Sequence, residues 1–248
     1  MQQISLKNHF GESLKGWKNL SGKSSAPAIV IVHGFASSSK SDLLTELGQE
    51  LAKNGFDAYC LTFSGMDESE GKYRETTLSK QVKELSEIIE FVRSQVKGKL
   101  FVFAQSFGTA ATIGLNPKVD GIILAGSARD HLNKLKNKFG DQLNVDGESS
   151  FIRKKTGEKI EIGPEFWPDL EKYDFVKLVS KIKTPILFVQ GEKDSTTEVE
   201  QMEFLFNGAN EPKEKYIVPG AEHKLEENRQ LAFSKIIEWL KKQNNQKS

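Results

Sequence analysis

The feature that most restricts the fold of this chain is a series of short, almost wholly apolar segments separated by longer amphipathic ones. Strands that are covered on both faces of a parallel sheet have this continuous apolar character, because neither face meets water. The apolar segments span residues 28–32, 58–62, 100–104, 121–125 and 186–190, and a further strand-like run covers 214–218.

The stretches between these segments carry apolar residues at helical spacing. They predict helices over residues 43–53, 78–96 and 225–242, and the N-terminal residues 4–20 predict a hairpin around Gly11. Strands that alternate with helices favour an α/β fold with a mostly parallel, doubly wound sheet. We predict a single domain over residues 1–248.

One region, residues 129–179, breaks this alternation. It contains a predicted helix over 132–139, a hairpin-like segment over 151–162 with Thr156 and Gly157 near its turn, and then a cluster of aromatic residues. We expect a small lid above the carboxyl edge of the sheet, which is where ligands bind in open α/β sheets. Phe166 and Trp167 are candidates for substrate contacts; the alternative is that they only pack the insertion.

Composition excludes several classes of partner. Lys and Arg total 35 against 34 for Asp and Glu, so the net charge of +1 gives no reason to expect nucleic acid or a membrane surface as a partner. No apolar run is long enough to span a membrane and the N-terminus lacks the core of a signal peptide, so we expect a cytoplasmic protein. A single cysteine, Cys60, permits neither an intramolecular disulfide nor a metal site built from cysteines.

The strongest chemical signal is the segment of residues 100–111, in which an apolar strand leads into Ser106 and then at once into a helix of small residues. A serine at such a sharp strand-to-helix turn is held above the sheet edge with its hydroxyl exposed. Ala104 and Gly108 are small enough to let the two backbones approach each other. Ser106 is therefore a candidate nucleophile; the alternative is a serine that only caps the helix.

Of the four histidines, His223 is the one placed to serve Ser106 as a general base. It follows a Pro-Gly turn after the run 214–218, so we expect it in a loop at the carboxyl edge. His9 lies in the N-terminal hairpin, His33 ends the first buried strand, and His131 begins the insertion.

Asp194 is the candidate for the carboxylate that orients His223. It follows the run 186–190 and should lie at the same edge of the sheet. Glu192 is the nearest competitor, and a plain charged turn is the alternative to both. Asp194 is preferred because of its place in the loop after the strand.

A developing oxyanion needs two N–H donors about 3 Å away. One should be the backbone N–H of Phe107, directly after Ser106. The other should be that of Phe35, because Gly34 lets the backbone turn beneath a substrate.

Together these segments resemble the α/β-hydrolase superfamily, and within it the cinnamoyl and feruloyl esterases and the serine aminopeptidase-like hydrolases. The resemblance covers nearly the whole chain and rests on residues 33–35, 63–71, 104–108, 191–194 and 220–223. It implies the α/β-hydrolase fold, with Ser106, Asp194 and His223 as the catalytic triad and Phe35 and Phe107 as the oxyanion donors. It implies no cofactor and no metal.

Two positions depart from the family pattern. Ala104 stands where the family commonly has glycine, two residues before the serine. The residues after Phe63 read Ser-Gly-Met-Asp, where the family usually has Arg-Gly-His-Gly, so the shape of this loop is expected to differ.

The leading expectation is a serine hydrolase, a carboxylesterase that cleaves a small-molecule acyl ester through an acyl-enzyme. A serine peptidase or amidase uses the same machinery and is the first alternative. A non-catalytic binding protein on the same fold is the second, and the intact set of three residues weighs against it. The acyl group, the leaving group and the oligomeric state are not specified by the sequence.

Overall fold

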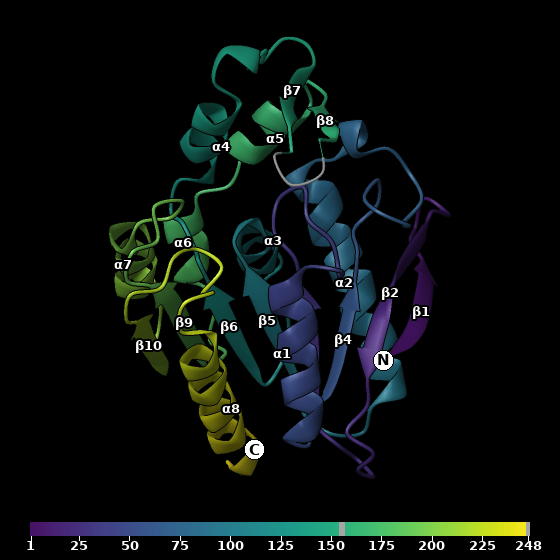
Figure 1. The fold of residues 1–248 in the computed structure, drawn as a ribbon, viewed down its shortest axis with the longest axis vertical. Coiled ribbons are helices and arrows are strands. Elements are labelled where there is room, and N and C mark those ends of the chain that lie inside the picture. Colours follow the sequence, from purple (N-terminus) through teal and green to yellow (C-terminus); the bar gives the residue numbers. More distant parts are fainter. Residues whose placement is uncertain (154–156, 247–248) are drawn as a thin grey trace.

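The computed structural model describes residues 1–153 and 157–246, which form a sheet of eight strands flanked by helices (Figure 1). The strands lie in the order β1-β2-β4-β3-β5-β6-β9-β10. All neighbours from β4 to β10 in this order pair in parallel, whereas β2 pairs antiparallel with both β1 and β4. The bounds are β1 Gln2–Lys7, β2 Ser13–Asn19, β3 Ala28–Val32, β4 Asp57–Leu61, β5 Leu100–Gln105, β6 Gly121–Ala125, β9 Ile186–Gly191 and β10 Lys213–Val218. The predicted mostly parallel α/β fold is confirmed.

Two helical layers cover the two faces of the sheet. Side chains alternate between the faces along each strand, so that in β3 Ile29 and Ile31 join one core and Val30 joins the other. The first core lies beneath α1 (Asp42–Lys53) and α8 (Arg229–Asn245); the second lies beneath α2 (Leu78–Gln95), α3 (Phe107–Leu115), α6 (Phe175–Val179) and α7 (Val199–Gly208). No helix in the described ranges combines the length and the apolar character needed to cross a membrane.

The C-terminal helix differs from its prediction over residues 225–242. It begins at Arg229 and continues to Asn245. Leu225 has a φ of 56°, which a residue inside a right-handed helix does not adopt. Its N–H donates to the Glu222 carbonyl at 2.9 Å and closes a turn, so the helix starts only after this turn.

Between β6 and β9 the chain builds a layer above the carboxyl edge of the sheet (Figure 1). The elements of this insertion are α4 (His131–Phe139), the 3₁₀ helix η2 (Gly140–Gln142), β7 (Ser149–Ile152), β8 (Lys159–Ile162), α5 (Phe166–Glu171) and finally α6. β7 and β8 pair antiparallel, as predicted for the hairpin, while Thr156 at the predicted turn lies outside the described residues. The last helix, α6, returns to the body of the protein and packs against α3 and α7.

Candidate active site

Ser106 occupies the sharp turn between β5 and α3. Its φ of 55° and ψ of −125° are uncommon for a residue with a side chain, and such a conformation persists only when the surroundings enforce it. The Ser106 N–H donates to the Ala125 carbonyl at 2.8 Å, which ties the turn to β6. Gly108 lies so close to the end of β3 that a Cβ would stand 2.6 Å from the His33 carbonyl oxygen, so only glycine fits there. Ala104 is fully buried at the end of β5.

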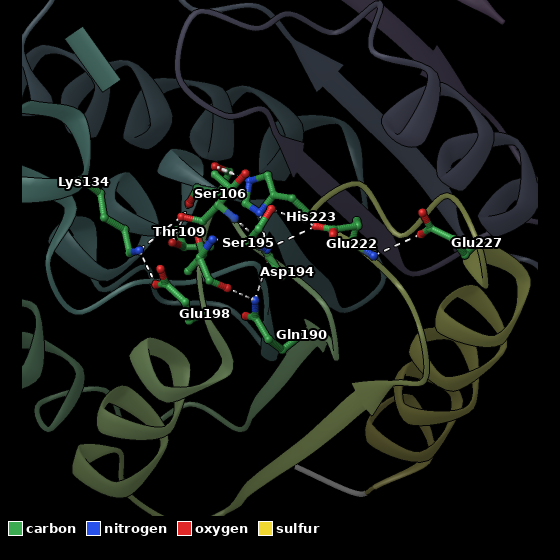
Figure 2. A network of polar contacts seen from close by, with 12 residues as sticks. Ser106, Thr109, Lys134, Gln190, Asp194, Ser195, Glu198, Glu222, His223 and Glu227 are labelled. Carbon is green, nitrogen blue, oxygen red and sulfur yellow. Dashed lines mark hydrogen bonds and ion pairs between the residues drawn. The ribbon is translucent and has the colours of Figure 1, made fainter. Parts of the chain in front are cut away.

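The side chain of Ser106 does not cap α3 but faces His223. Nε2 of His223 lies 2.9 Å from Ser106 Oγ, and Nδ1 lies 2.7 Å from Oδ2 of Asp194 (Figure 2). A carboxylate oxygen can only accept, so Nδ1 donates its proton to Asp194 and Nε2 keeps a lone pair for the Ser106 hydroxyl. The three loops that follow β5, β9 and β10 thus bring these side chains into one hydrogen-bonded row.

Asp194 is 4% exposed, and its carboxylate is surrounded by donors. Its Oδ1 accepts the backbone N–H groups of Thr196 and Thr197, at 2.9 and 2.7 Å. Its Oδ2 accepts Nε2 of Gln190 at 2.7 Å in addition to the His223 ring. Hydrogen bonds from donors stabilise the charged form of a carboxylate and hold it in one orientation.

Glu192, the competitor of Asp194 in the sequence, does not reach His223. It is exposed, and its Oε2 accepts the Gly220 N–H at 2.7 Å. Glu222, next to His223, accepts the N–H and the hydroxyl of Ser195, both at 3.1 Å. These glutamates hold the loops around the site, whereas Asp194 is the carboxylate that contacts the imidazole.

Phe35 and Phe107, the predicted oxyanion donors, lie beside Ser106. Phe107 is the first residue of α3, where backbone N–H groups have no acceptor within the helix. A Cβ on Gly34 would stand 3.0 Å from Cβ of Ser106, so the backbone leading into Phe35 passes directly against the serine. Within the described part of the chain, neither of the two N–H groups donates to another protein group.

Ser106 and His223 border a cavity of about 650 Å³. A volume of this size suits a small molecule. The apolar residues of its lining are Phe35, Leu43, Phe107 and Leu135, and most of the other lining residues carry hydroxyl, amide or charged groups. Lys134 of the insertion and Glu198 of the body both line the cavity and form an ion pair (Figure 2).

Phe166 and Trp167 do not line this cavity. Phe166 is fully buried behind the rings of Phe35 and Phe107, with centroids 5.7 and 5.9 Å away. Trp167 is 3% exposed and packs edge-on against Phe139, and its Nε1 donates to Ser149 Oγ at 3.3 Å. Both side chains therefore lie outside the lining of the cavity, and direct substrate contact by them stays a prediction that this placement does not favour.

Two buried histidines near the site were not singled out for a role in the sequence. His131 lines the cavity, with Nε2 3.5 Å from Thr109 Oγ1, and burial lowers its pKa to about 3. His33 ends β3, and burial lowers its pKa to about 4. Both rings are therefore neutral near pH 7. Nδ1 of the fourth histidine, His9, lies 3.0 Å from Oε1 of Glu87 on α2.

Gln190 and Tyr73 are further polar residues whose importance the sequence did not indicate. Gln190 lies among the apolar residues of β9, where an isolated amide was the available signal. Tyr73 follows the segment 63–71, in which the departure of residues 64–67 from the family pattern was the only signal. In the parts of the chain that the structure describes, no three His, Cys, Asp or Glu side chains form a group that could hold a metal ion.

The order of the strands and the serine turn after β5 define an α/β-hydrolase fold. Residues 23–144 match the family model described as serine aminopeptidase, S33. The match includes Ser106 and ends before Asp194 and His223. No curated protein matches the sequence.

Solved structures are similar over nearly the full chain. Est1E from Butyrivibrio proteoclasticus, solved with ferulic acid bound, has a TM-score of 0.84 and 16% identity, with 97% of this chain and 98% of that chain covered. The esterase domain of a Rhodothermus marinus protein has a TM-score of 0.72 and 19% identity, with 96% of each chain covered. The α/β hydrolase GrgF from Penicillium sp. sh18 has a TM-score of 0.79 and 16% identity, with 98% of each chain covered. The predicted resemblance is confirmed, and at these identities it concerns the fold.

Proposed function

We propose that the protein is a serine hydrolase that cleaves carboxylic esters of small molecules. The observation that carries this proposal is the hydrogen-bonded row from Ser106 through His223 to Asp194, beside a cavity of about 650 Å³. A serine hydroxyl is a weak nucleophile unless an adjacent base takes its proton. The imidazole of His223, whose Nε2 faces Ser106 Oγ, is placed to act as such a base.

In the proposed reaction, Ser106 Oγ attacks the acyl carbon while its proton moves to Nε2 of His223. The carbonyl oxygen becomes an oxyanion, which the N–H groups of Phe35 and Phe107 stabilise. The carbon–oxygen bond to the alcohol then breaks, and His223 returns the proton to the leaving alkoxide. Water, deprotonated by His223, attacks the acyl-enzyme and releases the acid, with the proton returning to Ser106. Asp194 holds the imidazole tautomer and stabilises the imidazolium throughout.

Replacement of the nucleophile tests the proposal. The Ser106→Ala variant is expected to fold normally and to lose roughly 10⁴-fold or more of its ester hydrolysis, because only the oxyanion donors and substrate binding remain. A fluorophosphonate probe should label the wild type at Ser106, as mapped by mass spectrometry, and should not label the variant. Labelling at another serine, or full activity of Ser106→Ala, would contradict the assignment.

A peptidase or amidase is the second candidate, since the family model matched by residues 23–144 is that of serine aminopeptidases. Ester and amide hydrolysis share the same catalytic groups, so the substrate decides. Turnover of p-nitrophenyl esters with no release from aminoacyl p-nitroanilides would select the esterase. The reverse result would select the peptidase, and no turnover of either would favour a binding protein on the same fold.

A further inference from the structure

The backbone of Gly34, Phe35 and Ala36, which we call the oxyanion loop, is held by hydrogen bonds from side chains outside it. Nδ1 of His33 lies 2.9 Å from the Gly34 carbonyl oxygen. Nε2 of the same ring accepts the Phe63 N–H at 2.9 Å, so Nδ1 carries the proton and donates it to Gly34. The peptide between Gly34 and Phe35 is trans, so its N–H points away from the carbonyl that His33 holds.

The next peptide of the oxyanion loop is held by Tyr73. The Ala36 N–H donates to the phenol oxygen of Tyr73 at 2.8 Å, in a buried setting. The Tyr73 ring also packs edge-on against the ring of Phe35, with centroids 5.7 Å apart. Tyr73 begins the 3₁₀ helix η1 (Tyr73–Glu75), 37 positions along the chain from Ala36, so this contact depends on the tertiary fold.

Ala36 has a φ of 47°, in the left-handed region that residues other than glycine seldom occupy. Such a conformation persists only when contacts enforce it. Residues in such conformations cluster at functional sites. The Tyr73 hydroxyl supplies one contact at the Ala36 N–H. The guanidinium of Arg153, from the insertion, supplies another at the Ala36 carbonyl.

We infer that Tyr73 is a positioning residue for catalysis, which holds the oxyanion loop so that the Phe35 N–H faces the oxygen of the tetrahedral intermediate. This inference rests on the proposed function. Tyr73 does not line the cavity, so it acts through the Phe35–Ala36 peptide rather than on the substrate.

A positioning residue and a residue that only stabilises the fold differ in their effect on kcat. An oxyanion donor interacts with charge that develops in the transition state, so a misplaced donor lowers kcat and leaves ground-state binding unchanged. A boronic acid that forms a tetrahedral adduct with Ser106 places an oxygen in the same position as the oxyanion. Its affinity should therefore fall in parallel with kcat.

The experiment compares Tyr73→Phe with Tyr59→Phe. Tyr73→Phe removes only the hydroxyl that holds Ala36, whereas Tyr59, on β4, is another buried tyrosine that does not contact the oxyanion loop through a hydrogen bond in the described residues. Active sites are first titrated with a fluorophosphonate, so that kcat is expressed per folded site. Tyr73→Phe should lower kcat for a p-nitrophenyl ester by about 10- to 100-fold, with KM changed less than about twofold, and should weaken the boronic acid by a similar factor. Tyr59→Phe should match the wild type.

A second variant, Ala36→Gly, keeps the inference testable if Tyr73→Phe folds poorly. Glycine adopts positive φ freely but also many other conformations, so the loop loses its enforced geometry without losing the Tyr73 contact partner. It should lower kcat in the same selective way. If the wild type is active and the kcat of Tyr73→Phe is unchanged, with or without a rise in KM, the inference about Tyr73 is overturned and the proposed function is not. A wild type that turns over neither ester nor anilide would overturn the proposed function and this inference with it.

Discussion

Among the three residues of the proposed triad, Asp194 makes the most side-chain hydrogen bonds. Asp194→Asn keeps the size of the side chain but puts an amide where the His223 Nδ1 proton is accepted, which favours the wrong imidazole tautomer. We expect kcat for a p-nitrophenyl ester to fall by roughly 10³- to 10⁴-fold while the protein stays folded. Glu192→Gln is the matched control, because Glu192 accepts only the Gly220 N–H near this loop. A crippled Glu192→Gln beside a nearly normal Asp194→Asn would reverse the assignment.

Gln190 orients Asp194 but has a side-chain oxygen that lowers the stability of the fold. Its Nε2 donates to Asp194 at 2.7 Å and to the Thr197 carbonyl at 2.6 Å, while its Oε1 is buried with no partner in the described residues. A buried amide oxygen without a donor costs stability. We therefore interpret Gln190 as kept for the orientation of Asp194 rather than for the stability of the fold.

Replacement by methionine separates these two contributions. Gln190→Met removes the donor to Asp194 together with the unpartnered oxygen, so we expect kcat to drop about tenfold with the free energy of unfolding changed by less than about 1 kcal/mol. Gln81→Met, at a buried glutamine on α2 that donates to Thr76, is the control and should keep its activity. Loss of stability in Gln190→Met with kcat intact would show that Gln190 serves the fold instead.

At the scale of elements, the insertion above the sheet combines a packed interior with a wall that faces the cavity. Trp167 belongs to the interior, so Trp167→Ala should lower the free energy of unfolding by about 3 kcal/mol, the usual cost of removing a large buried aromatic side chain. We expect the ranking of p-nitrophenyl esters by chain length to stay as in the wild type. Leu135→Ala, at the cavity wall, should change that ranking. A changed ranking in Trp167→Ala would instead support direct substrate contact.

The elements that could be predicted from the sequence are those whose pattern is local. β3 and β6 have their predicted bounds, because a strand buried on both faces is apolar throughout its length. α7 was not predicted, since this helix has ten residues and Met202 and Leu205 are its buried positions. The residues of α5 were recognised as an aromatic cluster without a helical assignment, because Pro168 obscures the pattern within six residues.

At the scale of the whole molecule, the sequence predicts which residues meet at the candidate site, but not which residues hold them in place. Ser106, Asp194 and His223 each follow a recognisable strand, and parallel strands bring their carboxyl ends to one edge. Tyr73 and Gln190 carry no such local signal, because a hydrogen bond to Ala36 or to Asp194 exists only once distant segments have packed. The same reason explains why Phe166 and Trp167 could not be assigned to the wall or to the interior.

Two buried histidines link the stability of the whole protein to pH. Burial lowers the pKa of His33 to about 4 and that of His131 to about 3. In the unfolded chain both rings have the ordinary pKa of about 6.5. Between these values the unfolded state binds more protons than the folded state, so stability is present above about pH 6.5 and is lost as the pH falls towards 4. Glu84 acts in the opposite sense, because burial raises its pKa.

The His131→Leu variant isolates one of these contributions. For each proton taken up on unfolding, the free energy of unfolding falls by about 1.4 kcal/mol when the pH is lowered by one unit. Urea unfolding between pH 6 and pH 4.5 should therefore show a slope that is smaller in His131→Leu than in the wild type by about one proton, whereas the Glu84 contribution is common to both proteins and cancels in the comparison. Leucine also fits the setting, since the His131 ring packs edge-on against Phe107 and Phe175 at 5.4 and 5.0 Å. Equal slopes in the two proteins would mean that His131 is protonated in the folded state, contrary to its burial among these rings.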